Sequence, residues 1–162
     1  MGGIVALELA ARFPDLPRAV VTLDSPVVAP QALLDSLAPA IQGLRTPAYR
    51  DVQKQIADML FLPTDNQEQR ARIVAGMANV PQHVAASAFQ HAFYDTAETV
   101  AAIKVPLLVL SAAQSFSDLA RLRTVCPSVT TGQTVGAGHF HQLEVPGQVN
   151  AMIERFLTLA VS

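Results

Sequence analysis

One histidine of this sequence stands in a setting suited to acid–base chemistry. His139 follows Gly136-Ala137-Gly138 and shortly precedes an amphipathic stretch at the end of the 162-residue chain. An imidazole changes its protonation state near neutral pH, so it can take up a proton and later return it. A lone loop histidine is more often a surface residue, and the weight given to His139 therefore depends on the pattern around it.

A second histidine, His141, stands two residues further on. A His-x-His pair can bind a metal ion, but metal sites usually need three or four ligands, and no cysteine or acidic cluster accompanies this pair. We therefore predict a role other than metal binding for His141, and no cofactor or metal is implied. His83 and His91 are expected to face solvent or a helical insertion rather than to take part in catalysis.

Two aspartates compete as the carboxylate that would orient His139. Asp24 directly follows the short β-branched run at 19–23, and Asp118 lies near the start of a predicted helix. Each has a simpler explanation, because Asp24 suits a turn before Pro26 and Asp118 suits the first turn of a helix. The residues alone leave both candidates open.

The chain offers poor candidates for a nucleophile. Ser25 has no flanking glycine and is followed by Pro26, so it cannot stand in the tight turn that exposes a catalytic serine. Cys126 is the single cysteine, which excludes an internal disulfide, and we expect it to be structural or exposed.

The elements that would carry these residues alternate between helix and strand. Helical apolar spacing covers residues 3–13, 116–125 and 146–160, and buried strands are predicted at 19–23, 105–111 and 129–135. Such alternation predicts a mostly parallel sheet with helices on its faces. Functional residues of such sheets lie in loops at the carboxyl ends of the strands, where Asp24 and His139 both stand.

Residues 30–95 interrupt this alternation with four predicted helices, at 30–43, 47–60, 65–79 and 81–95. We interpret them as an all-helical insertion. Its large apolar side chains could line a substrate pocket, but packing within the insertion is the favoured use of Met59, Leu60, Phe61, Met77, Phe89 and Phe93.

The composition and charge of the chain disfavour some classes of binding partner. Hydrophobic residues make up 51% of the chain and charged residues 15%, against about 25% in an average domain. The net charge is −2 and there is no run of Lys or Arg, which disfavours nucleic acid or an anionic membrane as a partner. The apolar start carries Glu8 and no basic segment, unlike a signal peptide. A chain with a single cysteine can form no internal disulfide, so a reducing, cytoplasmic location is expected.

Three stretches, taken in order, make the sequence resemble an α/β-hydrolase of the serine-hydrolase type. Met1-Gly2-Gly3 opens a helix that ends at Phe13-Pro14, and Leu23-Asp24-Ser25-Pro26 ends a strand. The third and most specific stretch, Gly136 to Phe140, looks like the loop that presents the catalytic histidine. The resemblance implies a partial α/β-hydrolase fold with the last three strands and an inserted helical cap. It divides the chain into core residues 1–28, a cap at 29–97 and core residues 98–162.

The resemblance also implies roles for particular residues. His139 would be the catalytic base, and Asp24 would be the acid, because some small esterases place that acid about two dozen residues beyond the serine. Other members place it after the strand at 105–111, where this sequence has no carboxylate, and Asp118 comes late. Met1 would follow the nucleophile and contribute to the oxyanion hole, so the serine itself would stand just before Met1.

The expected reaction is therefore hydrolysis of a small-molecule carboxylic ester or a related acyl bond, and we expect the 162-residue chain to be inactive alone. Within the family, an aspartate-nucleophile dehalogenase or epoxide hydrolase and a cofactor-free haloperoxidase remain alternatives, as does a non-catalytic binding or dimerisation module. The strand at 19–23 would normally pair with a preceding strand, so self-association through an exposed sheet edge is also expected.

Overall fold

The computed structural model of the chain, described for residues 1–160, contains a parallel sheet of three strands, β1 (Val20–Leu23), β2 (Leu107–Ser111) and β3 (Thr130–Gln133). The strands lie in the order β1-β2-β3, with Val20 opposite Leu107 and Leu108 opposite Thr130. All five residues of β2 are buried, as expected of a central parallel strand made of leucine, valine and serine.

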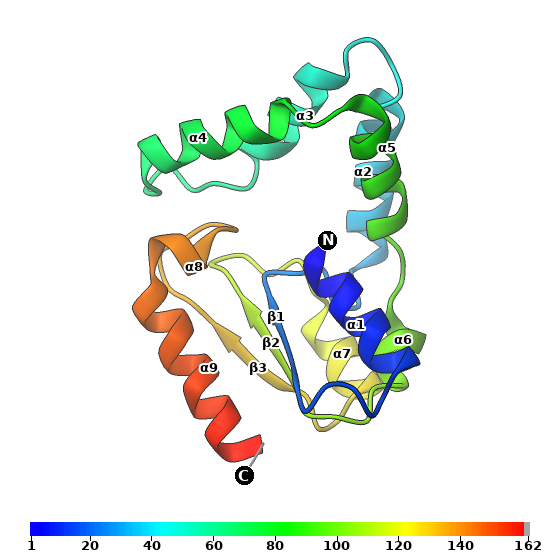
Figure 1. Cartoon of the computed structure of the whole chain (residues 1–162), viewed down its shortest axis with the longest axis vertical. Helices are drawn as coiled ribbons and strands as arrows, with labels where there is room; N and C mark the ends of the chain where they lie inside the picture. Colours follow the sequence, from blue (N-terminus) through cyan, green and yellow to red (C-terminus); the bar gives the residue numbers. More distant parts are fainter. Residues whose placement is uncertain (161–162) are drawn as a thin grey trace.

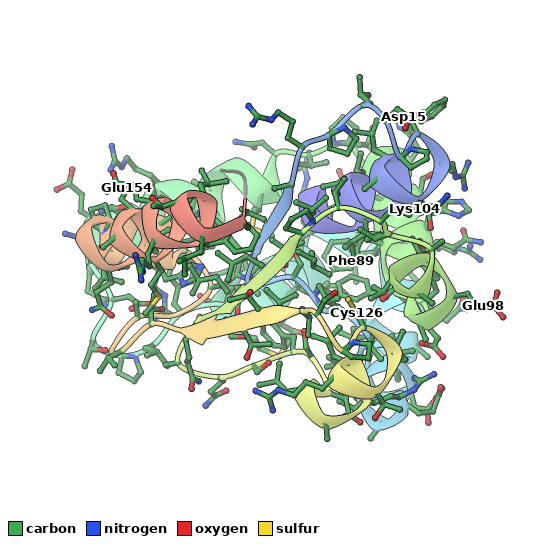
Figure 2. All side chains as sticks on the ribbon, turned by 90° about the horizontal axis from the view of Figure 1, so that it is seen from below. Asp15, Phe89, Glu98, Lys104, Cys126 and Glu154 are labelled. Carbon is green, nitrogen blue, oxygen red and sulfur yellow. The ribbon has the colours of Figure 1, made fainter. Side chains whose placement is uncertain are left out.

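Helices cover both faces of this sheet (Figures 1 and 2). On one face lie α1 (Gly2–Arg12), α6 (Ala97–Ala101) and α7 (Leu119–Val125), and on the other lies α9 (Pro146–Ala160). Successive side chains of a strand point to opposite faces, so β2 serves two cores. Leu107 and Val109 pack with α1, α6 and α7, whereas Leu108 and Leu110 pack with Val149 and Phe156 of α9.

Four helices follow β1 and lie beyond the carboxyl ends of the strands (Figure 1). They are α2 (Gln31–Gly43), α3 (Tyr49–Asp58), α4 (Gln67–Ala78) and α5 (Gln82–Ala92), and we call residues 31–92 the helical segment. The segment has a small core of its own around Leu44, Ile56 and Ala85. Its loop between α3 and α4 reaches the loop that carries His139, through a hydrogen bond from the His139 amide to the Leu60 carbonyl.

The predicted elements are present, with bounds that differ by at most three residues. Two short helices had no sequence signal, α6 and α8 (His141–Glu144). One position was wrong: Asp118 was placed inside a helix, but it precedes α7 and caps it. Its amide donates to the carbonyl of Val28, so the chain is still bound to the β1 loop there. The three predicted regions stay a prediction, and the last extends to residue 162, outside the described residues.

Among residues 1–160 there is no helix long and apolar enough to cross a membrane. The same residues contain no group of three or more His, Cys, Asp or Glu side chains that could hold a metal ion.

Candidate active site

Asp24 and His139 form the centre of the candidate site. The Oδ2 atom of Asp24 lies 2.8 Å from the Nδ1 atom of His139. The other carboxylate oxygen accepts a hydrogen bond of 2.9 Å from the Ala112 amide, which follows β2. Asp24 is almost fully buried, whereas 29% of the His139 side chain is exposed. A buried carboxylate with a fixed second partner therefore holds one ring nitrogen, and the described residues leave Nε2 of His139 available for chemistry.

The backbone that presents Asp24 is in a constrained conformation. Its amide continues the sheet ladder by donating to the Leu110 carbonyl at 2.7 Å, and its φ of 47° then turns the chain out of β1. Val28 also has a positive φ, 51°, which is uncommon for a β-branched residue. The Val28 amide donates to Thr96 Oγ1 at 2.8 Å, and the Val27 amide to Ser117 Oγ at 3.0 Å. These contacts hold the loop in a conformation that costs free energy, as is common at functional sites.

The loop that carries His139 is held on two sides. Gly136 has a φ of 75°, a conformation that favours glycine. The Ala137 carbonyl accepts from the Ala113 amide at 3.1 Å, and the His139 amide donates to Leu60 in the helical segment at 2.8 Å. The imidazole also meets the edge of the Phe140 ring, with centroids 5.0 Å apart. The position of the ring is therefore set by contacts to the sheet, to the helical segment and to Asp24.

A pocket of about 300 Å³ opens beside this pair. His139 lines it together with the start of α1 and the side of β1, and its other lining residues are Met1, Gly2, Gly3, Ala6, Val21, Thr22, Leu23 and Ser25. The structure thus places Met1, the residue expected at the oxyanion hole, in the same pocket as His139. A negative charge that develops there would lie near the start of α1, where the helix dipole favours it.

The remaining sequence candidates lie elsewhere or do other work. The Asp118 carboxylate accepts from the Arg121 amide at 3.0 Å, which makes it the cap of α7, and Asp24 rather than Asp118 meets His139. Ser25 lines the pocket, but its hydroxyl donates weakly to the Leu23 carbonyl at 3.4 Å. Cys126 is half-buried, 3.7 Å from the hydroxyl of Ser128.

His141 is fully buried and does not face the pocket. Its Nδ1 atom lies 2.8 Å from Thr134 Oγ1, and no protein atom of residues 1–160 pairs with its Nε2 atom. Burial lowers the pKa of His141; the charge of Asp24 opposes this effect and that of His139 adds to it. The neutral ring is therefore favoured at the base of the loop that carries His139.

The apolar residues of the helical segment do not line the pocket beside His139. Phe61 is buried and its ring packs against Phe140, with centroids 5.1 Å apart. Phe89 packs against Phe93 at 5.4 Å and joins the core of the segment, whereas Met59 is exposed. Packing within the insertion, the use favoured by the sequence, thus describes Phe89, whereas Phe61 packs against the loop of His139 and Met59 is exposed.

Sequence reasoning missed Asp65, in the loop between α3 and α4. Its carboxylate is buried and accepts hydrogen bonds from the Leu62 amide and from the Gly138 amide, next to His139. No local pattern marks it, because Gly138 lies 73 positions away in the sequence.

No protein-family model and no curated protein matches the sequence. Solved structures do. A hydrolase from Oleispira antarctica matches with a TM-score of 0.81 and 15% identity, over 97% of this chain and 62% of that one. A thermophilic esterase from Thermogutta terrifontis matches with a TM-score of 0.75 and 16% identity, over 99% of this chain and 63% of that one. The enol-lactonase from Burkholderia xenovorans LB400 matches with a TM-score of 0.73 and 19% identity, over 98% of this chain and 63% of that one.

These similarities establish the fold. The chain has part of an α/β-hydrolase fold, as the sequence predicted, and it spans a little over three-fifths of the length of the structures that it matches.

Proposed function

We propose that this chain carries the histidine and the acid of an α/β-hydrolase that cleaves a carboxylic ester or a related acyl bond. The observation that carries the proposal is the 2.8 Å contact between buried Asp24 and His139, at the rim of a pocket shared with Met1. The structures that it matches include an esterase and an enol-lactonase, which supports acyl chemistry for the whole protein. A non-catalytic module has no need for a buried carboxylate aimed at a partly exposed imidazole.

The reaction would use the two residues as follows. Asp24 accepts a hydrogen bond from the Nδ1–H group of His139, which keeps the proton on Nδ1 and leaves Nε2 unprotonated and able to act as a base. Nε2 takes the proton of a serine hydroxyl as the serine oxygen attacks the acyl carbon. The resulting imidazolium is stabilised by Asp24 and returns its proton to the leaving alcohol. Water then repeats the sequence on the acyl-enzyme.

The nucleophile would come from the residue immediately before Met1, in a Gly-x-Ser-Met-Gly-Gly turn. In that arrangement the Met1 amide donates to the developing oxyanion, and the start of α1 adds its dipole. Gly3 supports this geometry, because a Cβ atom there would overlap the side chain of Ser25. The start of α1 can therefore approach the end of β1 as closely as such a turn requires.

The test compares the 162-residue chain with a version extended by the residues encoded in frame before Met1. The extended protein is expected to hydrolyse p-nitrophenyl esters and to be labelled by a fluorophosphonate, and His139→Ala should abolish hydrolysis. The 162-residue chain should do neither, because loss of a triad nucleophile lowers turnover by about 10⁶.

Two outcomes would contradict the proposal. One is an upstream sequence without a Gly-x-Ser stretch after a hydrophobic strand. The other is ester turnover by the purified 162-residue chain that disappears in His139→Ala, since the serine would then be dispensable.

A further inference from the structure

The loop between α3 and α4 holds a buried carboxylate that the proposed reaction does not use. Asp65 is 3% exposed. Its Oδ2 atom accepts a hydrogen bond of 2.8 Å from the Leu62 amide, within its own loop. The Gly138 amide reaches the same carboxylate, at 3.1 Å from Oδ1 and 3.2 Å from Oδ2. The carboxylate is therefore bound by backbone N–H groups of two loops that lie far apart in the sequence.

This contact belongs to a continuous junction between the helical segment and the loop of His139. Next to the Asp65–Gly138 pair, the His139 amide donates to the Leu60 carbonyl at 2.8 Å. Phe61 and Phe140 pack together beside it. Further along, the Asn66 amide donates to Glu144 Oε2 at 3.1 Å. Backbone, aromatic and side-chain contacts thus join the two loops on both sides of the catalytic histidine.

The junction leaves no room for a side chain at position 138. A Cβ atom built on Gly138 would lie 2.7 Å from the Leu60 carbonyl oxygen and 3.0 Å from the Leu62 nitrogen. The two backbones therefore approach more closely than any residue but glycine allows. The Asp65 carboxylate lies at this close contact and accepts a hydrogen bond from the Gly138 amide.

A buried carboxylate loses its hydration, and only good hydrogen bonds compensate for that loss. An apolar side chain in this loop would avoid the loss but would leave the Gly138 amide without its acceptor. Burial of the Asp65 carboxylate therefore costs free energy, and its hydrogen bond fixes the orientation of the Gly138–His139 peptide unit.

We infer that Asp65 is a positioning residue for His139. By binding the Gly138 amide, it fixes the backbone from which the imidazole projects, so that Nδ1 meets Asp24. The helical segment thereby becomes part of the support of the catalytic histidine and not only a cover over the sheet. The inference rests on the proposed function for the catalytic role of His139, but its geometric content can be tested without substrate.

The first measurement uses the wild-type 162-residue chain with ¹⁵N-labelled histidine and glycine. The Gly138 and His139 amides should be protected from hydrogen exchange, and the Nδ1–H proton of His139 should give a resolved resonance far downfield. In Asp65→Asn, which keeps the shape but loses the charge, exchange of the Nδ1–H proton and of the Gly138 amide should accelerate by about tenfold or more, because hydrogen bonds to charged groups contribute that much. Asp65→Ala should give a larger effect.

Two control variants separate positioning from loss of stability and from loss of charge. Ile56→Ala removes buried apolar atoms from the core of the helical segment without touching the junction, and it should lower the unfolding midpoint while leaving the Nδ1–H signal in place. Asp51→Asn removes an exposed charge from the first turn of α3; it should lower the unfolding midpoint only slightly and leave the Nδ1–H signal in place.

Equal changes of the Nδ1–H signal in Asp65→Asn and Ile56→Ala would overturn the inference, as would an unchanged signal in both Asp65 variants. If neither Asp65 variant folds, the wild-type chain decides, since a Gly138 amide that exchanges as fast as an open loop is incompatible with the inference. None of these readouts requires turnover. Failure of ester hydrolysis in the extended protein would therefore reject the proposed function and leave the positioning result standing.

Discussion

The Asp24 carboxylate and the His139 imidazole lie 2.8 Å apart, although 115 residues separate them in the chain. Asp24 follows β1 and His139 follows β3, and these strands flank β2. The residues after β2 connect the two, because the Ala112 amide donates to Asp24 and the Ala113 amide donates to Ala137. The pair is thus assembled across the carboxyl edge of the whole sheet, and each strand contributes to its geometry.

The choice of acid can be tested in the extended protein that contains the serine. Asp24→Asn should lower kcat by about 10⁴, because an amide in this place favours the wrong imidazole tautomer. Asp118→Asn should change kcat by less than about tenfold, since asparagine caps a helix as well as aspartate does. Steady-state ester hydrolysis by both folded variants decides the matter. The reverse ranking would assign the acid to Asp118, and two small effects would exclude both residues.

The close approach of α1 to β1 predicts opposite effects for two neighbouring glycines. Gly2→Ala meets no atom within 4 Å and should stabilise the chain by up to about 1 kcal/mol, because alanine is the better helix former. Gly3→Ala would overlap Ser25 and should destabilise it by about 1–3 kcal/mol through overpacking. Urea unfolding of the two variants and the wild type measures both effects. A Gly3→Ala variant as stable as Gly2→Ala would show that α1 does not lie this close to β1.

We propose that the 162-residue chain self-associates. Within residues 1–160 the strand β1 pairs only with β2. The helix α1 and the two residues that flank it carry an exposed apolar stripe at four-residue spacing, formed by Met1, Val5, Leu9 and Phe13. Light scattering on a dilution series should show an average molar mass that decreases as the protein is diluted. Val5→Lys should shift this dissociation to higher protein concentration. Leu159→Lys, at a residue of similar exposure on α9, is the matched control. A monomer at every concentration would refute the proposal.

Burial of His141 predicts a pH-dependent stability. In the folded chain, burial lowers the pKa of His141 below its usual value. At a pH between the folded and the unfolded pKa, the unfolded chain therefore binds a proton at His141 that the folded chain does not. Stability should therefore fall as the pH drops through the usual histidine pKa, and this loss should end below the folded value.

Unfolding midpoints at several pH values between about 7 and 4 test this effect. His141→Asn can keep the contact to Thr134 and should flatten the pH dependence, whatever its effect on stability at pH 7. His83→Gln, at an exposed position, should leave the pH dependence unchanged. A wild-type slope that survives in His141→Asn would assign the effect to another group.

The periodicity of apolar residues predicted most of the elements, because burial on one face of a helix or on both faces of a strand leaves a direct mark on residue order. The run Leu107 to Ser111 and the apolar face of α9 are examples. The short helices α6 and α8 were missed, since four or five residues cannot display a helical period. The placement of Asp118 inside a helix was wrong, because its extended backbone and the bond from its amide to Val28 show that the helix begins only at Leu119.

The sequence by itself determined which residue types could do chemistry and which strand end each would follow. Asp24 directly after one strand and His139 in a glycine-containing loop after another are local features. Only the tertiary structure decided that these two residues contact each other, that Asp118 caps α7, and that Asp65 binds the Gly138 amide. Those facts depend on the order of strands in the sheet and on contacts between loops, and no local pattern of residues encodes a contact across 73 or 115 positions.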